Sequence, residues 1–170
     1  MLNANDPPEI SGTPATSVNE DSPYSFTPSA SDPDISDSLT FDINNKPDWA
    51  DFSTSTGSLT GTPDNGDVGT SQPITIGVSD LAGARATLAA FTITVVNTND
   101  PPELSGSPAN SVSENSPYSF TPVLSDPDVG DSHDFEIVNQ PDWADFDDGT
   151  GQLSGTPAAN PAHRQRRARE

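Results

Sequence analysis

The chain has 170 residues, no cysteine, 30% hydrophobic residues and a formal net charge of −20. This length allows one or two domains, and the lack of cysteine excludes disulfide staples and thiol chemistry. The acidic excess excludes a general nucleic-acid binder, because phosphates would be repelled, and no apolar run reaches the ~20 residues that cross a bilayer.

The first feature met along the chain is an internal repeat. Residues 5–63 return as residues 99–157, displaced by 94 positions, so that Asn5 matches Asn99 and Trp49 matches Trp143. Repetition at this period indicates a tandem array of small domains. We predict a first repeat at residues 1–98, a second repeat at residues 99–160 that lacks its last strands, and a basic tail at residues 161–170.

Alternating apolar residues predict the strands of the first repeat. In chain order the runs are Tyr24 with Phe26, then Leu39, Phe41 and Ile43, then Leu59, then Ile74, Ile76 and Val78, and finally Phe91, Ile93 and Val95. The 18 prolines and 12 glycines fall mostly between these runs, where they fix turns and block helices. We therefore predict an all-β, two-sheet Greek-key sandwich in each repeat, the second one truncated.

Two kinds of aromatic residue need an interpretation. Trp49 and Trp143 either fill the core or stack on sugar rings, and the core interpretation is the simpler one. His133 stands where the first repeat has Leu39, so a polar ring replaces an apolar side chain. We assign no function to this single histidine.

The tail at residues 161–170 holds four of the six basic residues. Arginine clusters can bind nucleic acid or membranes. Here the cluster follows an acidic chain and lacks interleaved aromatics, so we interpret the tail as disordered or foreign to the repeat, through frameshift, truncation or fusion.

Acidic and amide side chains gather at the ends of the predicted strands. Ca²⁺ takes six to eight oxygen ligands of this kind. One set lies near the free end of the first repeat: Asn3, Asn5, Asp6, Asp32, Asp34 and Asp80. A second set lies around the junction of the repeats: Asn97, Asn99, Asp100, Asp126 and Asp128, which Glu20 joins if its strand runs toward that end. The alternative is that they are solvated turn residues, because Asp and Asn favour turns on local grounds.

These motifs resemble the cadherin-like repeats of bacterial surface proteins, specifically the dystroglycan-type cadherin-like or Ig-like module. The motifs that carry the resemblance are Asn97-Thr98-Asn99-Asp100-Pro101-Pro102, Asn19-Glu20-Asp21-Ser22-Pro23-Tyr24, Ser31-Asp32-Pro33-Asp34 and their counterparts in the other repeat. The resemblance implies tandem Ig-like or cadherin-like sandwiches with Ca²⁺ between successive domains, held here by the junction set. Asn97 stands where cadherins usually have Asp, and the second repeat lacks a counterpart of Asp80. We therefore expect an affinity no tighter than ~10⁻⁴ to 10⁻³ M.

The sequence thus predicts a calcium-binding extracellular or cell-surface module, a rigid spacer or adhesion unit of a large bacterial surface or secreted protein. The alternative is a calcium-dependent polysaccharide-binding module attached to a secreted enzyme. The expected partners are adjacent repeats, with another surface protein or a polysaccharide as further candidates, and neither nucleic acid nor direct membrane insertion. We expect no enzyme, because the Asp32 and Asp34 pair recurs in each repeat, as a structural role requires, and the first repeat has no histidine.

Overall fold

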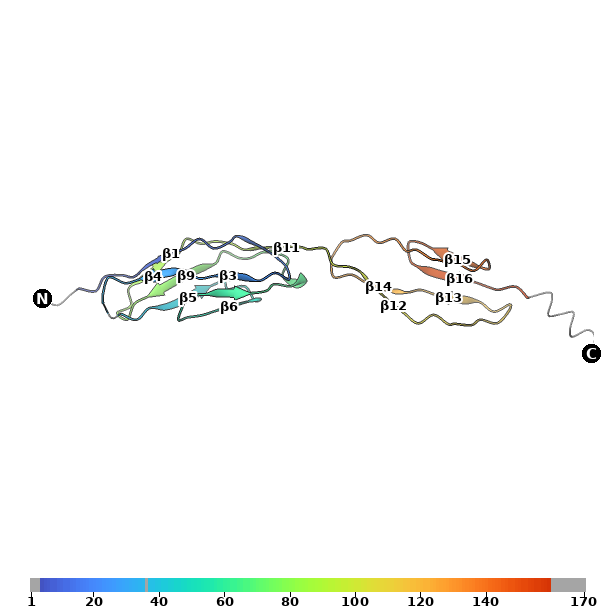
Figure 1. Ribbon diagram of the computed structural model, residues 1–170, viewed down its shortest axis with the longest axis horizontal. Coiled ribbons are helices and arrows are strands. Elements are labelled where there is room, and N and C mark those ends of the chain that lie inside the picture. Colours follow the sequence, from blue (N-terminus) through green and yellow to red (C-terminus); the bar gives the residue numbers. More distant parts are fainter. Residues whose placement is uncertain (1–3, 36, 160–170) are drawn as a thin grey trace, which may run out of the picture. The chain divides into compact units, whose positions relative to one another are not determined.

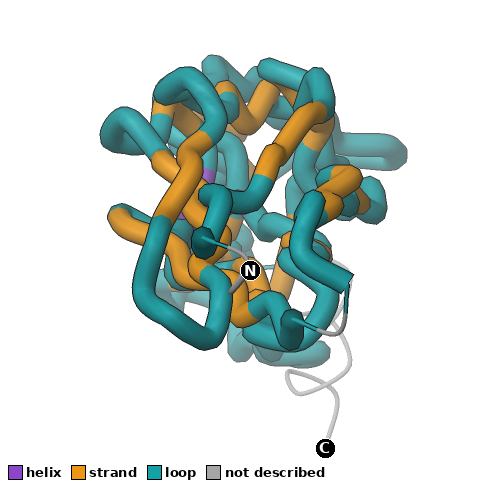
Figure 2. The backbone as a smooth tube through the Cα atoms, turned by 90° about the vertical axis from the view of Figure 1, so that its left-hand side faces the viewer, coloured by secondary structure: helices purple, strands orange, loops and turns teal. Residues whose placement is uncertain are grey.

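The computed structural model describes residues 4–35 and 37–159, and the chain divides into two compact units, Met1–Asn99 and Asp100–Glu170. Both units consist of short strands joined by longer loops (Figures 1 and 2). No helix in the described residues has the length and apolar character needed to cross a membrane. The predicted ligand Asn3 and the tail at residues 161–170 lie outside the described residues.

The first unit consists of short strands and one 3₁₀ turn. The strands are β1 (Glu9–Ser11), β2 (Ser17–Asn19), β3 (Tyr24–Phe26), β4 (Ser29–Ser31), β5 (Thr40–Asn44), β6 (Ala50–Phe52), β7 (Leu59–Gly61), β8 (Gly69–Thr70), β9 (Thr75–Ser79), β10 (Arg85–Thr87) and β11 (Thr94–Val96). The 3₁₀ turn η1 (Asn65–Asp67) starts with a capping box, in which the Asp64 and Asp67 side chains accept backbone amides.

Strands far apart in the sequence lie next to one another in the first unit. The sheets run β10-β9-β5, β3-β7-β6, β2-β11-β8 and β1-β4. Most pairs are antiparallel, but β2 and β11 are parallel, so Asn19 and Val96 lie opposite each other at the same end. These crossovers belong to a Greek-key sandwich, and they bring the loops after β2 and β11 together.

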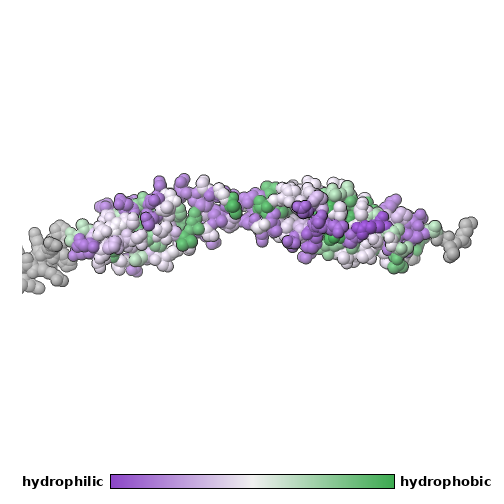
Figure 3. Space-filling view, turned by 180° about the vertical axis from the view of Figure 1, so that it is seen from behind, coloured by the Kyte–Doolittle hydropathy of each residue, from purple (hydrophilic) through white to green (hydrophobic). Residues whose placement is uncertain are grey.

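The core of the first unit lies between these sheets. The largest fully buried apolar side chains are Leu59, Ile74, Ile76, Ile93 and Val78. They come from the alternating runs that predicted the strands, because period-2 alternation places every second side chain on the inner face. Hydrophilic and neutral colours cover most of the face shown in Figure 3, with hydrophobic residues in separate patches, as the acidic composition requires.

Two glycines, one before β7 and one at its end, are required for steric reasons. Gly57 has φ +70°, and a Cβ there would lie 2.5 Å from the Phe41 ring. A Cβ on Gly61 would lie 2.4 Å from the Trp49 carbonyl oxygen. Trp49 packs against the core and meets the Tyr24 ring edge-on, with 5.7 Å between ring centroids. The structure therefore supports the core interpretation of this tryptophan.

The second unit has fewer strands among its described residues. They are β12 (Glu103–Ser105), β13 (Tyr118–Phe120), β14 (Val123–Ser125), β15 (Ala144–Asp147) and β16 (Gln152–Gly155). They form the sheets β12-β14 and β13-β16-β15, which repeat the arrangements β1-β4 and β3-β7-β6 of the first unit.

Residues 134–138, which correspond to β5, form no strand. In the first unit β5 pairs with β9, from Thr40 opposite Ser79 to Asn44 opposite Thr75. The described part of the second unit contains no counterpart of β9. A strand needs a hydrogen-bonded partner strand. Without one, the same apolar alternation gives an extended segment that forms no ladder.

Candidate metal site

One end of the first unit gathers six polar residues, which we call the first acidic cluster: Asn5, Asp6, Asp32, Asp34, Asp37 and Asp80. The loop after β4 builds its centre. The Asp34 amide donates to Asp32 Oδ1 at 2.8 Å, and the Asp37 amide donates to the Asp34 carbonyl oxygen at 3.3 Å. Asp favours such Asx-turns because its carboxylate accepts an amide two residues on, so the sequence folds this loop around its own carboxylates.

Two further segments join this loop. Asp80 directly follows β9, and its carboxylate accepts the Ala84 amide at 2.8 Å and the Asn5 side-chain amide at 2.8 Å. The Asp6 amide donates to Asp34 Oδ2 at 2.7 Å. The N-terminal segment is thereby tied to both the loop after β4 and the loop after β9.

The first acidic cluster brings carboxylates of like charge close together. One carboxylate oxygen from each of Asp32, Asp37 and Asp80 lies within 4.8 Å of the other two. The pKa of Asp37 is raised from 3.8 by desolvation, and then by the negative charges of its neighbours, chiefly Asp32. The pKa of Asp80 is lowered, first by the hydrogen bond from Asn5. At Asp37, like charge thus adds to the effect of desolvation.

The hydrogen bonds above leave one buried carboxylate oxygen of the first acidic cluster without a partner among the described residues. Asp32 Oδ2 is buried and accepts no hydrogen bond in the described part of the chain. A buried carboxylate oxygen without a partner costs free energy unless a cation compensates it. Oxygens on opposite sides of a Ca²⁺ ion lie about 4.6 to 5.2 Å apart, twice the usual ligand distance. The spacing and the oxygen-only chemistry of this cluster therefore fit Ca²⁺.

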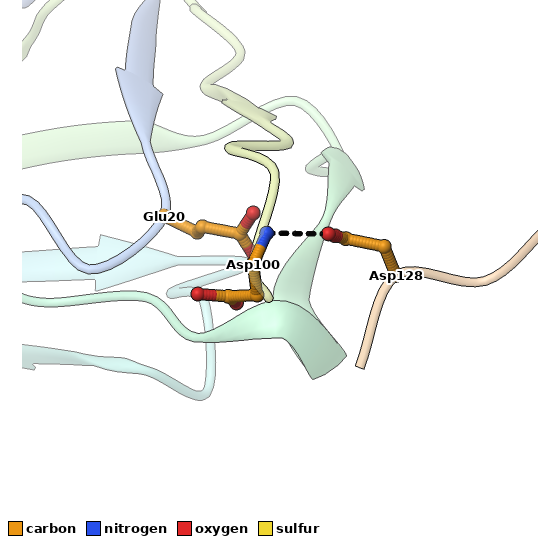
Figure 4. A group of neighbouring side chains, drawn as sticks. All are labelled: Glu20, Asp100 and Asp128. Carbon is orange, nitrogen blue, oxygen red and sulfur yellow. Dashed lines mark hydrogen bonds between the residues drawn. The ribbon is translucent and has the colours of Figure 1, made fainter. Parts of the chain in front are cut away.

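The second unit repeats the same loop, which we call the second acidic cluster: Asp100, Asp126, Asp128 and Asp131. The Asp100 amide donates to Asp128 Oδ2 at 2.6 Å, the dashed line in Figure 4. The Asp128 amide donates to Asp126 Oδ1 at 2.8 Å. Asp128 is buried, and its Oδ1 has no hydrogen-bond partner among the described residues.

The two clusters differ at the position of His133. Its Nε2 lies 3.2 Å from Asp126 Oδ2, the counterpart of the unpartnered Asp32 Oδ2 in the first unit. Leu39, at the matching position of the first unit, packs against the hydrophobic core instead. His133 thus contacts the Asp126 oxygen whose counterpart in the first cluster, Asp32 Oδ2, has no hydrogen-bond partner among the described residues.

Glu20 lies directly after β2 (Figure 4). Only 2% of this residue is exposed. Its amide donates to the Val96 carbonyl oxygen at 3.0 Å, and its Oε1 accepts the Thr98 amide. Its Oε2 has no hydrogen-bond partner within the described chain. The parallel pairing of β2 with β11 therefore places Glu20 beside the segment that contains Thr98.

Hydrogen bonds link most of the predicted ligands in small groups. These groups are Asn5 with Asp80, Asp6 with Asp34 and Asp32, and Asp100 with Asp128 and Asp126. Asn97 and Asn99 are exposed. The sequence reasoning missed Asp37, although it lies three residues after Asp34 and recurs as Asp131. That spacing was the available signal.

A separate cavity of 330 Å³ lies beside Trp49. Its wall combines the indole with polar groups from the loops, including Asn45, Asp48 and Gln72. An aromatic face beside hydrogen-bonding groups is the chemistry that a sugar ring contacts.

Comparisons with solved structures show the fold. The chain is 17% identical to protocadherin gamma B2 extracellular cadherin domains 1–5, with a TM-score of 0.54, covering 96% of this chain and 36% of that one. It is 16% identical to mouse cadherin-23 domains EC22–24, with a TM-score of 0.51, covering 95% and 57%. A protein described as a putative alpha-galactosidase from Bacteroides fragilis is 14% identical, with a TM-score of 0.42, covering 56% and 19%. The chain thus spans less than two thirds of each of these structures.

A search among curated proteins found no match for the chain. The family described as "Putative Ig domain" matches residues 7–96 and 101–164, which is most of the sequence. Together with the cadherin-like fold of both units, this match identifies the chain as a tandem pair of Ig-like, cadherin-like repeats that belongs to the Putative Ig domain family.

Proposed function

We propose that the chain is a calcium-binding extracellular module without catalytic activity, and that it serves as a rigid spacer or adhesion unit of a large bacterial surface or secreted protein. In the first acidic cluster Asp32, Asp37 and Asp80 would hold the ion directly, with Asn5, Asp6 and Asp34 as further oxygen donors. Bound Ca²⁺ would supply positive charge that cross-links the three segments of this cluster.

The observation that carries the proposal is the convergence of three carboxylate oxygens within 4.8 Å of one another, with no basic side chain in the described residues paired to them. Like charges at this separation repel each other. Solvated turn residues would be expected to point their carboxylates away from one another. The raised pKa of Asp37 and the unpartnered Asp32 Oδ2 both point to a cation as the missing component.

The junction set, Glu20, Asn97, Asn99, Asp100, Asp126 and Asp128, stays a prediction from the sequence. Within the first unit Glu20 holds the Thr98 amide, and within the second unit Asp128 holds the Asp100 amide.

Calcium titration by calorimetry tests the first acidic cluster. Asp32→Asn removes one charged ligand but keeps an oxygen, and we expect it to weaken binding by at least about tenfold. Asp51→Asn is the matched control, because it makes the same charge change at an exposed position of β6, outside the cluster. Equal affinities of the two variants would show that calcium senses only the overall charge.

The second candidate function is calcium-dependent polysaccharide binding, and the cavity beside Trp49 is the observation that favours it. Retention on insoluble polysaccharide, measured with calcium and then with chelator, tests it. Trp49→Phe keeps an aromatic core residue but shortens the stacking surface, so it should reduce retention. A wild-type chain that is not retained in either condition would exclude this candidate.

A further inference from the structure

The second unit has an apolar groove whose matching residues form the buried core in the first unit. Its cavity of 270 Å³ is lined chiefly by Leu104, Tyr118, Phe120, Phe135, Ile137 and Leu153. In the first unit the matching residues Tyr24, Phe26, Phe41 and Leu59 belong to the buried core. Among the described residues, the groove is therefore a core surface without its cover.

The first unit shows what covers this surface. β9 lies against β5 with Val78 opposite Phe41 and Ile76 opposite Ile43. Both β9 residues, and the preceding Ile74, are fully buried. An alternating apolar strand is thus the element whose shape and chemistry fit the groove.

Backbone groups beside the groove are arranged for an added strand. The Phe135 amide donates to the Asp148 carbonyl oxygen at 2.9 Å, just as the Phe41 amide donates to Thr54 at 2.8 Å. Because successive amides of an extended segment point to opposite sides, those of Asp134, Glu136 and Val138 point to the side where β9 lies in the first unit. These three amides make no hydrogen bond within the described part of the chain.

The two units also differ in an ion pair between neighbouring strands. In the first unit Arg85 of β10 reaches across Gly77 of β9 and pairs with Asp42 of β5 through both guanidinium nitrogens. Glu136 stands at the position of Asp42, and no ion pair is found for it among the described residues. The groove therefore carries a carboxylate that is complementary to a basic residue on an incoming hairpin.

We propose that this groove binds a β-hairpin with the chemistry of β9–β10, as supplied by another repeat of this kind. The first strand adds antiparallel to residues 134–138 and fills the groove with its apolar face. A glycine opposite Glu136 lets an arginine of the second strand reach that carboxylate. This is strand addition to an exposed edge, and the second unit is the acceptor.

Fluorescence anisotropy of a labelled peptide spanning residues 73–87, titrated with the whole 170-residue chain, tests the proposal. We expect saturable binding. Hydrogen exchange then reports the register, because the peptide should slow exchange of the Asp134, Glu136 and Val138 amides. The Phe135 amide, already hydrogen-bonded, serves as the internal control and should change little.

Matched peptides separate strand addition from general stickiness. A peptide with Ile76→Asp and Val78→Asp keeps its length but cannot fill the groove, and it should bind at least about tenfold more weakly. A peptide with Arg85→Glu should bind about two- to fivefold more weakly, and Glu136→Arg in the protein should restore its affinity.

Two results would overturn the proposal. One is binding that survives both aspartate substitutions, or exchange protection outside residues 134–138. The other is sedimentation of the chain alone as a dimer that the peptide fails to dissociate, because the groove would then be closed by a second copy in another way.

Discussion

Asp37 is the residue whose charge should have opposite effects with and without a bound cation. Its carboxyl lies against Asp32 and Asp80, and its pKa is raised by desolvation and by these neighbours. Asp37→Asn should therefore raise the melting temperature of the calcium-free protein, because it removes repulsion. The same change should reduce the stabilisation that added Ca²⁺ gives, because it removes a charged ligand.

The pH dependence of the Asp37 effect follows from the direction of the shift. A carboxyl whose folded pKa lies above its ordinary 3.8 binds a proton more tightly in the folded state. The calcium-free protein therefore loses stability as pH rises from about 3.8 through the folded pKa. The advantage of Asp37→Asn should be full at neutral pH and vanish below pH 3.8. An advantage that persists in acid would point to a cause other than charge.

The second prediction for a single residue concerns His133. His133→Leu installs the side chain of the first unit and frees Asp126 Oδ2, so we expect Ca²⁺ to bind the second acidic cluster up to about fivefold more tightly. The reciprocal Leu39→His should place a ring beside Asp32 and weaken binding at the first cluster. Calcium titration of both variants by calorimetry checks the pair, and shifts in the same direction would contradict this role.

At the scale of single elements, β7 depends on a glycine that the sequence motif repeats in both units. A Cβ at Gly61 would lie 2.4 Å from the Trp49 carbonyl oxygen, which is backbone and cannot turn away. Gly61→Ala should therefore cost about 1 to 3 kcal/mol of unfolding free energy. Chemical denaturation measures this, with Gly66→Ala as the control, since a Cβ there meets only the Asp64 carboxylate at 3.1 Å.

The sequence predicted the strands β3, β5, β7 and β9 from their large apolar side chains. β3, β5 and β9 each alternate visibly, and their apolar side chains form the core. β4, with the sequence Ser29-Ala30-Ser31, has a single small inward residue, so it has no detectable period. The expected strand through Phe91, Ile93 and Val95 is interrupted. Phe91 bridges to Ile74, Ile93 bonds to Ser71, and β11 begins only at Thr94.

Contacts between residues far apart in the sequence could not be predicted. This limited the prediction of both the fold and the candidate site. Residues 134–138 have the same alternation as β5 but form no strand, because a ladder needs a partner that local sequence does not supply. The loop Asp32-Pro33-Asp34 was visible in the sequence. The approach of Asp80 and Asn5 to that loop depends on where β9 ends beside the N-terminal segment.

At the scale of the whole molecule, the two units differ in how well they bury their apolar residues. The first unit buries nine core residues in one cluster, whereas the second exposes 61% of Leu104 and 74% of Val138. Because stability follows apolar burial, we expect two separate unfolding transitions, with the second unit melting first. Each unit contains one tryptophan, so Trp143→Phe and Trp49→Phe variants assign each fluorescence transition to its unit.

Calcium should raise the transition of the first unit. At 10 mM Ca²⁺ and a dissociation constant of about 1 mM, linkage predicts roughly 1.4 kcal/mol, or on the order of 5 to 10 °C for a domain of this size. Salt also relieves the repulsion of a chain with a net charge of −20, so NaCl at equal ionic strength is the necessary control. A transition that shifts equally in NaCl and CaCl₂ would mean that calcium only screens charge. A larger shift in CaCl₂, lost in Asp32→Asn but kept in Asp51→Asn, requires a site in the first acidic cluster.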